Sequence, residues 1–293
     1  MDIHANAFPS VAAGRDEDAP EDPSESMDAS ADKAEKAGGT HTLERALTLL
    51  KAFGGYPGPV TNAELVRRTG FSKASVSRIT ATLVALGYLD RASDGLRYQI
   101  GMQGLVLGHN YRANNPIKLH ARPIMQEYAD EHDMSVALAT GDGMDTLYIE
   151  YCKSPRIATL RMGVGMRMPM ELTSIGRTYL WAQRPAERER LLSDIRRRGD
   201  EKQVANSMLR IEQAFDHLEK FGYCVAMGEF QRDSFGISVP VYLGNPAIPM
   251  ALNCGGILPA PSDQHIHNVL VPRLVQAAAR IAAATADIDS MLI

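Results

Sequence analysis

The chain has 293 residues, of which 45% are hydrophobic and 23% charged, and its formal net charge is −4. This length and composition allow two domains with sizeable cores and exclude a fibrous or low-complexity protein. The sequence contains no apolar run of membrane-spanning length, no signal-peptide pattern and no CxxC pair among its three cysteines. We therefore expect a cytoplasmic protein with no membrane partner.

Charge is unevenly distributed along the chain. Residues 1–40 contain ten acidic and three basic residues and almost no large apolar ones, so they cannot bury enough surface to become ordered. We expect a disordered tail there, which is either a passive solvated segment or a competitor of DNA. Residues 41–105 contain eight basic and four acidic residues, which indicates a local binding site for a polyanion.

Two short helices are predicted at the start of this basic region. Leu43, Leu47 and Leu50 follow a helical spacing that predicts an inward-facing stripe. Thr61 and Glu64 then have the form of a capping box, in which the Thr61 hydroxyl and the Glu64 carboxylate each accept from the other residue's amide. A helix should follow and close at a left-handed glycine, Gly70.

A third helix has the features of a recognition helix. Ser72 is a suitable N-cap, and a buried stripe is expected from Val76, Ile79, Leu83 and Leu86. The opposite face is small and polar, which allows close approach to a DNA groove. The predicted DNA contacts of this helix are Ser72, Lys73, Ala74, Ser75, Ser77 and Arg78.

Residues 88–100 have the pattern of a β-hairpin, with turn chemistry at 93–95 and with Tyr98 and Ile100 on one face. Arg91 and Arg97 flank the hairpin and are expected to bind phosphates, so that binding weakens as salt rises. Together these elements predict a winged helix-turn-helix that binds double-stranded operator DNA. The competing interpretation is a small helical domain used for protein contacts.

The second half of the chain has a mixed α and β pattern. Strands are expected over residues 135–140, 146–152 and 158–162, and a helix over 175–181. The start of that helix offers unpaired amides and a partial positive charge, which suit a carboxylate. The hydroxyls of Thr173 and Ser174 either complete such a site or only cap the helix.

Two further features bear on a ligand site. Met166, Met168 and Met170 alternate before this helix and form either an adaptable apolar wall or ordinary core. Asn253 lies in an otherwise small and apolar final strand, where its amide needs a partner from a ligand or from the backbone. Gly255 would leave room beside it.

In order along the chain, several segments resemble the IclR-type transcriptional regulators. The resemblance covers roughly residues 41–290. The segments that carry it are LERALTLLKAF, AELVRRTGFSKASVSRITATLVALGYLDR, RYQIG, ARPIMQEYADEH, LRMGVGMRMPMELTSIGRTYLWA, FGYCVAMGEF and GISVPVYLGNPAIPMALNCGG.

The resemblance implies an α+β protein, with an N-terminal winged helix-turn-helix and a C-terminal GAF-like effector domain built on an antiparallel sheet flanked by helices. It also implies a homodimer or dimer of dimers whose DNA binding is controlled by a small-molecule effector. We expect this effector to be an organic or aromatic acid of a catabolic pathway. The domain boundaries that we expect are a tail at 1–40, a DNA-binding domain at 41–101, a linker helix at 102–118 and an effector domain at 119–293.

The sequence departs from the family pattern at the effector site. The resemblance places Gly236 where relatives often carry a cysteine, Asn253 and Gly255 where they present two serines, and Ala226 near an acidic position. A small keto-acid pocket is therefore not preserved, and a larger or more apolar effector is expected. The predicted effector contacts are Met162, Met168, Thr173, Ser174, Gly176, Gly236, Asn253 and Gly255.

An enzyme is the less favoured alternative. His265 and His267 do not share a helix face, so they predict no metal site, and no common catalytic or nucleotide-binding motif is present. We expect no catalytic residues, no metal and no cofactor. The other alternative is an architectural DNA-binding protein that responds to no ligand.

Overall fold

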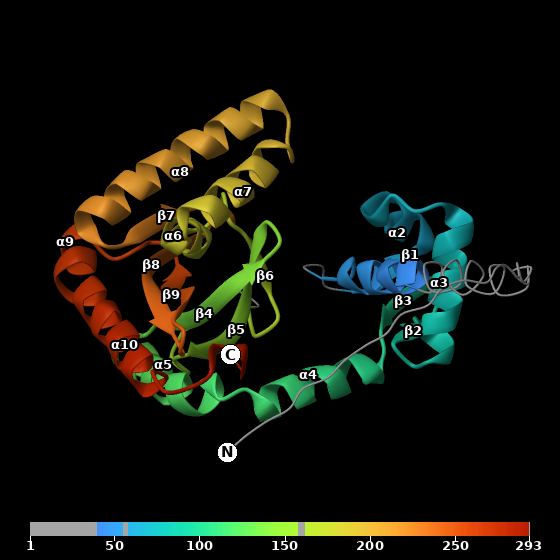
Figure 1. Cartoon of the computed structure of the whole chain (residues 1–293), viewed down its shortest axis with the longest axis horizontal. Helices are drawn as coiled ribbons and strands as arrows, with labels where there is room; N and C mark the ends of the chain where they lie inside the picture. Colours follow the sequence, from blue (N-terminus) through green and yellow to red (C-terminus); the bar gives the residue numbers. More distant parts are fainter. Residues whose placement is uncertain (1–39, 55–57, 158–161, 293) are drawn as a thin grey trace, which may run out of the picture. The chain divides into compact units, whose positions relative to one another are not determined.

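A computed structural model describes residues 40–54, 58–157 and 162–292. Within them lie a three-stranded sheet of order β1-β3-β2 and a six-stranded sheet of order β6-β5-β4-β9-β8-β7, each accompanied by helices (Figure 1). This arrangement confirms the predicted α+β class. None of the helices in the described ranges is long and apolar enough to cross a membrane.

The first helix covers residues 40–51, and its buried face differs from the predicted one. Leu43 and Leu47 are exposed, whereas Leu49 is fully buried and Leu50 is half-buried. The predicted stripe was therefore wrong at Leu43 and Leu47, correct in part at Leu50, and did not include Leu49. Leucines occur on two adjacent faces of this helix, so spacing alone could not decide which face turns inward.

The helix-turn-helix follows closely from its capping residues. Thr61 caps α2 (Asn62–Thr69) by accepting from the amide of Glu64 at 3.2 Å, and Gly70 closes it at φ 70°. The reciprocal half of the capping box is absent, because the Glu64 carboxylate instead binds Arg67 and Arg68 at 2.8 and 2.7 Å. Two guanidinium groups compete more strongly for that carboxylate than one backbone amide does.

The third helix, α3 (Lys73–Ala85), has Ser72 as its N-cap. It is followed by a hairpin of β2 (Leu89–Arg91) and β3 (Arg97–Ile100). A short strand that the sequence did not predict, β1 (Val60–Thr61), pairs with β3 and completes the wing. Val76, Ile79 and Leu83 are buried as expected, but Leu86 is 60% exposed because it caps the helix end beyond the buried stripe. Ile100 is also exposed, at the last position of its strand.

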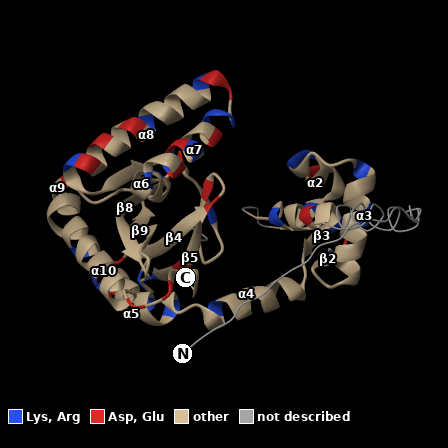
Figure 2. Cartoon of the chain, in the orientation of Figure 1, with Lys and Arg blue, Asp and Glu red and all other residues tan. Residues whose placement is uncertain are grey.

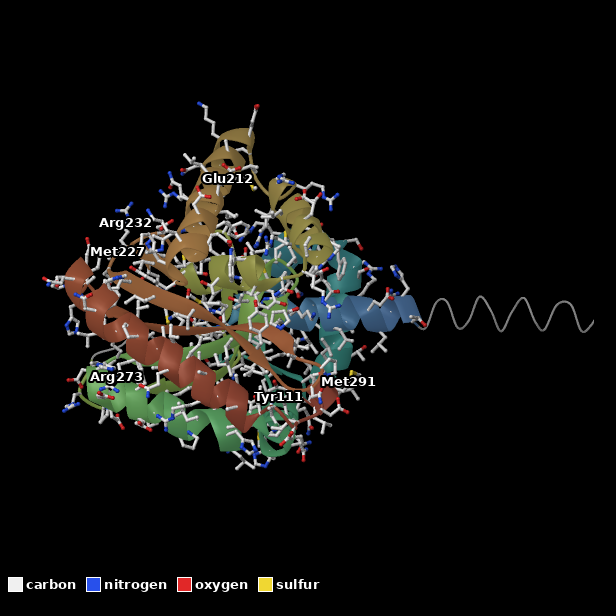
Figure 3. All side chains as sticks on the ribbon, turned by 60° about the vertical axis from the view of Figure 1, so that its left-hand side comes forward. Tyr111, Glu212, Met227, Arg232, Arg273 and Met291 are labelled. Atoms are coloured by element: carbon white, nitrogen blue, oxygen red, sulfur yellow. The ribbon has the colours of Figure 1, made fainter. Side chains whose placement is uncertain are left out.

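The predicted linker helix is shorter than expected. It forms α4 (Met102–Asn114) and is followed by a separate helix, α5 (Ile117–His132). Pro116 explains the break, because a proline disfavours helical backbone at the residue before it. None of the residues of α4 is buried, and its exposed apolar side chains include Leu105 and Tyr111, the latter labelled in Figure 3.

The six-stranded sheet is antiparallel throughout. Its strands are β4 (Ser135–Asp142), β5 (Asp145–Lys153), β6 (Arg167–Pro169), β7 (Cys224–Met227), β8 (Ser234–Leu243) and β9 (Ile248–Ile257). The predicted strand over 158–162 lies almost wholly outside the described residues, and its one described member, Met162, is not in a strand. β6 takes an edge position that the sequence analysis left unassigned.

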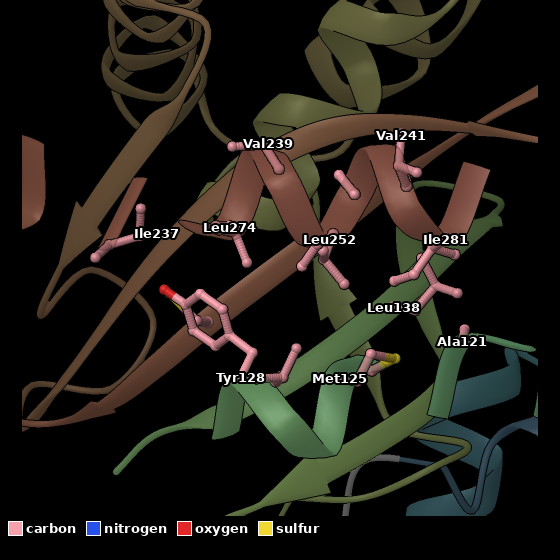
Figure 4. Close-up of a cluster of buried hydrophobic side chains, with 14 of the residues drawn as sticks. Ala121, Met125, Tyr128, Leu138, Ile237, Val239, Val241, Leu252, Leu274 and Ile281 are labelled. Carbon is pink, nitrogen blue, oxygen red and sulfur yellow. The ribbon is translucent and has the colours of Figure 1, made fainter. Parts of the chain in front are cut away.

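Helices cover both faces of this sheet. On one face, α5 and α10 (Val271–Ala284) enclose the main core, where Met125 and Tyr128 meet Leu252 and Leu274 (Figure 4). On the other face lies α6 (Ser174–Ala182), followed by α7 (Pro185–Arg196) and α8 (Glu201–Phe221). Short helical segments α9 (Asp263–His265) and η1 (Ile266–Leu270) lead into α10, and η2 (Ser290–Leu292) ends the described chain.

A β-bulge changes the direction of side chains in β5. Leu138 of β4 pairs with Glu150 and Ala139 pairs with Tyr148, so Ile149 is an extra residue in its strand. The alternation of side chains shifts at that point. As a result Tyr148 and Tyr151, three positions apart, both pack on the α6 face of the sheet.

Candidate DNA-binding surface and effector cavity

The exposed face of α3 carries the residues that the sequence singled out. Lys73, Ala74, Ser77 and Arg78 are exposed, and Figure 2 shows the positive charge on α2 and α3. Ser72 is exposed as well, but its hydroxyl serves the helix by accepting from the amide of Ser75 at 3.3 Å. The helix therefore presents small polar groups and two cations.

Ser75 does not belong to this exposed face. Its side chain is buried, and its hydroxyl lies 3.1 Å from the hydroxyl of Ser72. The helical register explains this position, because Ser75 lies beside Val76 and one turn before Ile79 on the inward side. A role in positioning the start of α3 fits Ser75 better than contact with a base.

The two arginines of the wing are exposed and locally held. Arg91 donates to the carbonyl of Gly95 at 3.0 Å and lies over the ring of Tyr98. Arg97 pairs with Asp94 at 2.5 Å, and hydrogen bonding from Arg97 lowers the pKa of that carboxyl. These contacts fix the wing turn while leaving both guanidinium groups facing solvent.

A cavity of about 650 Å³, counted with its opening to solvent, lies between α6 and the sheet. Seven of the eight predicted effector contacts border it, namely Met162, Met168, Thr173, Ser174, Gly236, Asn253 and Gly255. Gly176 does not border it. A Cβ atom at Gly176 would lie 2.3 Å from the Cα of Met170, so this glycine allows the helix to pack closely against that segment.

The polar centre of the cavity is a hydrogen bond between two buried side chains. Ser174 donates to Oδ1 of Asn253 at 2.9 Å, and Nδ2 of Asn253 has no hydrogen-bond partner among the described residues. A Cβ atom at Gly236 would lie 2.7 Å from the Ser174 hydroxyl and 3.0 Å from Oδ1 of Asn253. The glycine therefore makes the space in which this pair forms.

Gly255 borders the cavity and also lies close to the neighbouring strand. A Cβ atom there would lie 2.4 Å from the carbonyl oxygen of Phe235 on that strand. The close approach of β8 to β9 therefore requires a glycine at this position. Contact between Gly255 and an effector stays a prediction.

Thr173 serves as the N-cap of α6. Its hydroxyl accepts from the amide of Gly176 at 3.1 Å and donates to the carbonyl of Pro169 at 2.8 Å. Both functions of the hydroxyl are therefore used within the protein, as the capping interpretation expected. The amides of Ser174 and Ile175 belong to the first helical turn, where no intrahelical acceptor is available.

Aromatic and apolar side chains form the rest of the wall. The rings of Tyr148 and Tyr151 are nearly parallel, with centroids 6.3 Å apart, and Phe230 and Phe235 also border the cavity. These residues were not among the predicted effector contacts. Tyr148 and Tyr151 reach the same wall only through the bulge at Ile149, which no periodicity signals.

Glu229, for which the sequence contains no signal of a site, also borders the cavity, from the loop between β7 and β8. Arg177, only 3% exposed, binds both its carboxylate oxygens, at 3.0 and 2.5 Å, and Arg210 binds one of them at 2.5 Å. Burial raises the pKa of Glu229, but hydrogen bonds and charge from the two arginines outweigh it and hold the pKa below its ordinary value. The loop is therefore anchored to both α6 and α8.

These features define a protein with a basic winged helix-turn-helix and a second domain in which a cavity lies between a helix and the sheet. The IclR helix-turn-helix domain matches residues 42–93, and the bacterial transcriptional regulator IclR C-terminal domain matches residues 109–283. The chain belongs to the IclR family of DNA-binding transcriptional regulators, as the sequence resemblance predicted.

Individual relatives agree with this assignment. The chain is 31% identical to the HTH-type transcriptional regulator TsaQ1/TsaQ2 of Comamonas testosteroni, over 76% of this chain and 79% of that protein. It is 28% identical to the Pca regulon regulatory protein of Pseudomonas putida, over 72% of each. Both of these relatives are named as regulators, and neither is named as an enzyme.

Solved structures show the same fold. An IclR family transcriptional regulator from Brucella abortus superposes with a TM-score of 0.73 at 31% identity, covering 83% of this chain and 92% of that one. An IclR homolog from Microbacterium hydrocarbonoxydans, complexed with 4-hydroxybenzoate, gives 0.62 at 22% identity, over 83% and 98% of the two chains.

Proposed function

We propose that this regulator binds a small aromatic or organic acid in the cavity at Ser174 and Asn253, and that the bound acid changes its affinity for operator DNA. The observation that carries the proposal is the Ser174–Asn253 pair, which leaves one amide donor beside the cavity with no hydrogen-bond partner among the residues that the structure describes. This amide donor can therefore bind an acceptor atom of a ligand in the cavity.

The polar end of the cavity suits a carboxylate. Nδ2 of Asn253 and the first amides of α6 are donors, and the helix N-terminus adds a partial positive charge. Glu229 also borders the cavity, but Arg177 and Arg210 neutralise it. A carboxylate therefore meets donors at one end without facing an unpaired negative charge.

The opposite wall suits a planar ring. Tyr148, Tyr151 and Phe235 offer aromatic faces and edges, and aromatic pairs prefer offset or edge-to-face packing. Met162 and Met168 can adapt to the outline of the ring. That the relative from Microbacterium hydrocarbonoxydans is complexed with 4-hydroxybenzoate supports the same class of ligand.

DNA contacts are proposed for the exposed face of α3 and for the wing. Arg78 and Ser77 would read base edges, whereas Lys73, Arg91 and Arg97 would bind phosphates. Ser72 and Ala74 would lie close to the backbone of the groove. A regulator that binds the chromosome in this way acts in the cytoplasm.

The active species is proposed to be a homodimer or a dimer of dimers. Isolated copies would leave α4 with all of its residues unburied, including Met102, Leu105 and Leu107, and an exposed apolar helix of this kind is typical of an interface. We retain a tail at 1–40, a DNA-binding domain at 41–101, a linker at 102–118 and an effector domain at 119–293 as the working division.

The test is thermal melting of the full chain with 4-hydroxybenzoate, with phenol as the matched ligand that lacks the carboxylate. A ligand at 100 times its Kd stabilises the native state by about 2.7 kcal/mol. We expect a shift with the acid and little or none with phenol. If no aromatic or organic acid shifts melting while the protein still binds DNA flanking its own gene, the ligand-independent architectural alternative is supported.

A further inference from the structure

β7 is the edge strand of the six-stranded sheet, and α8 packs beside it (Figure 1). A second cavity lies between these two elements. It measures about 770 Å³ with its opening to solvent. Arg210, Gln213 and His217 border it from α8, at spacings of three and four that place them on one helix face. Among the described residues, Glu229 alone borders both this cavity and the effector cavity, so the two are separate sites.

The charge of this α8–β7 cavity favours an anion. Two arginines, Arg177 and Arg210, face a single carboxylate, that of Glu229. Cys224 adds no charge, because burial raises the pKa of its thiol to about 12. The bordering residues therefore leave one positive charge without a counterion in a partly enclosed space.

That positive charge belongs mainly to Arg210. Arg177 is saturated, since it binds the carbonyl of Glu171 through Nε and Nη2 and binds Glu229 through Nη1 and Nη2. Arg210 binds Glu229 through Nη1 and Asn206 through Nε, which leaves Nη2 with no hydrogen-bond partner among the described residues. The side chain of Gln213, one turn further along α8, likewise has none there.

His217 adds an acceptor to these donors. Its Nδ1 lies 2.7 Å from the carbonyl oxygen of Tyr223. A carbonyl oxygen can only accept, so Nδ1 carries a proton, and the tautomer that this bond selects has Nε2 as its acceptor. A ligand that uses the whole α8 face must therefore bring negative oxygens to Arg210 and an O–H donor to His217.

We propose that the α8–β7 cavity binds a small oxyanion that also carries a hydroxyl group. Hydrogenphosphate and 2-hydroxycarboxylates share this chemistry. The anionic oxygens bind Nη2 of Arg210 and the amide of Gln213, and the hydroxyl donates to Nε2 of His217. Sulfate, which has the charge but no hydroxyl, lacks the last contact and binds more weakly.

The only tryptophan of the chain provides a readout at this site. Trp181 packs against a cluster that contains Ala214 and Cys224, and both of these residues also border the α8–β7 cavity. The full chain is titrated with inorganic phosphate, with lactate and with sulfate at constant ionic strength, and Trp181 fluorescence and calorimetric heat are recorded together. We expect saturable binding of phosphate or lactate, with sulfate about tenfold weaker or more.

Variants locate the binding. Arg210→Gln and Gln213→Leu should each raise the Kd about tenfold or more, since each removes a donor, one of them charged. The matched control is Arg280→Gln, because Arg280 is similarly exposed, also pairs with a glutamate and lies on α10 against the other face of the sheet. Gln213→Leu keeps the Glu229 pairs intact, so its effect cannot arise from the effector cavity.

The titrations with phosphate, lactate and sulfate distinguish the possible ligands of the α8–β7 cavity. Saturable binding of phosphate alone assigns the site to phosphates, and binding of lactate alone assigns it to hydroxycarboxylates. The proposal is overturned if neither anion gives saturable heat, if sulfate binds as tightly as both, or if Arg210→Gln binds as well as the unmodified chain. Aromatic-acid melting is measured independently, so failure here leaves the proposed effector site unaffected.

Discussion

Ser174 at the start of α6 donates a hydrogen bond of 2.9 Å to Asn253 in the last strand, across 79 positions of the chain. This bond joins the helix that covers the sheet to the strand at the sheet's centre, beside the cavity. It also fixes the orientation of the Asn253 amide, whose oxygen accepts from Ser174 and whose nitrogen has no hydrogen-bond partner in the described part of the chain. A ligand that binds this donor thereby contacts both elements.

Replacing Asn253 by alanine should weaken effector binding more than it harms the fold. Asn253→Ala removes the ligand donor and leaves the Ser174 hydroxyl without its acceptor, which costs about 1–3 kcal/mol of stability. We expect the Kd for 4-hydroxybenzoate to rise about tenfold or more, measured by calorimetry. A folded variant that binds the acid as well as the unmodified chain would contradict the assigned polar centre.

Gly236 should tolerate no side chain. In Gly236→Ala the new Cβ would lie 2.7 Å from the Ser174 hydroxyl, so the Ser174–Asn253 bond must shift or break. We expect a loss of about 1–3 kcal/mol in the free energy of unfolding, together with weaker effector binding. Denaturant titration measures the first and calorimetry the second.

The control for this prediction is Gly108→Ala in α4. A Cβ atom there meets nothing within 4 Å, so the change should be neutral or stabilise the helix by up to about 1 kcal/mol. Equal destabilisation by both substitutions would mean that crowding at Gly236 is not the cause.

Local chemistry made the DNA-binding half predictable. The ends of α2 and the start of α3 are set by contacts between residues at most four positions apart, at Thr61, Gly70 and Ser72. Local sequence is therefore sufficient to predict where these helices begin and end. The hydrogen-bond partners of a side chain with several possible donors nearby were harder to predict. The Glu64 carboxylate binds two arginines instead of the backbone amide of Thr61. Which of these bonds forms depends on their relative strengths, and the capping-box motif does not contain that information.

The effector cavity was predictable in outline but not in detail. Asn253 is conspicuous in its strand because a buried amide needs a partner, and that argument needs no structure. The two tyrosines reach one wall through a single extra residue, Ile149, and Glu229 meets Arg177 from a position 52 residues away. Such relationships arise from register and tertiary packing, which residue spacing does not encode.

Arg78→Ala should weaken specific DNA binding and relax its specificity. An exposed arginine on a recognition helix that contacts a base edge contributes about 1–3 kcal/mol of discrimination. We expect a comparable loss on the operator and a much smaller one on unrelated DNA, measured by fluorescence anisotropy. An equal loss on both DNA sequences would instead assign Arg78 to a phosphate contact.

Lys73→Ala should behave differently from Arg78→Ala. If Lys73 binds a phosphate, its removal weakens binding to all DNA sequences about equally and lowers the slope of log K against log salt by about one. The same anisotropy titrations repeated at several salt concentrations give this slope. Arg280→Ala, a change on α10, should leave both the affinity and the slope unchanged.

The ion pairs of Glu229 should make stability depend on pH. Because the pKa of Glu229 in the folded protein is lowered, its contribution is fully present above the ordinary glutamate pKa and is lost as the pH falls through the folded value. Glu229→Gln leaves the buried Arg177 without its counterion, which should cost about 3 kcal/mol near pH 7. Thermal melting from neutral to acidic pH should therefore show the gap between variant and unmodified chain narrowing as the pH falls below about 4. A gap that stays constant over this range would show that the destabilisation comes from altered packing and not from the charge of Glu229.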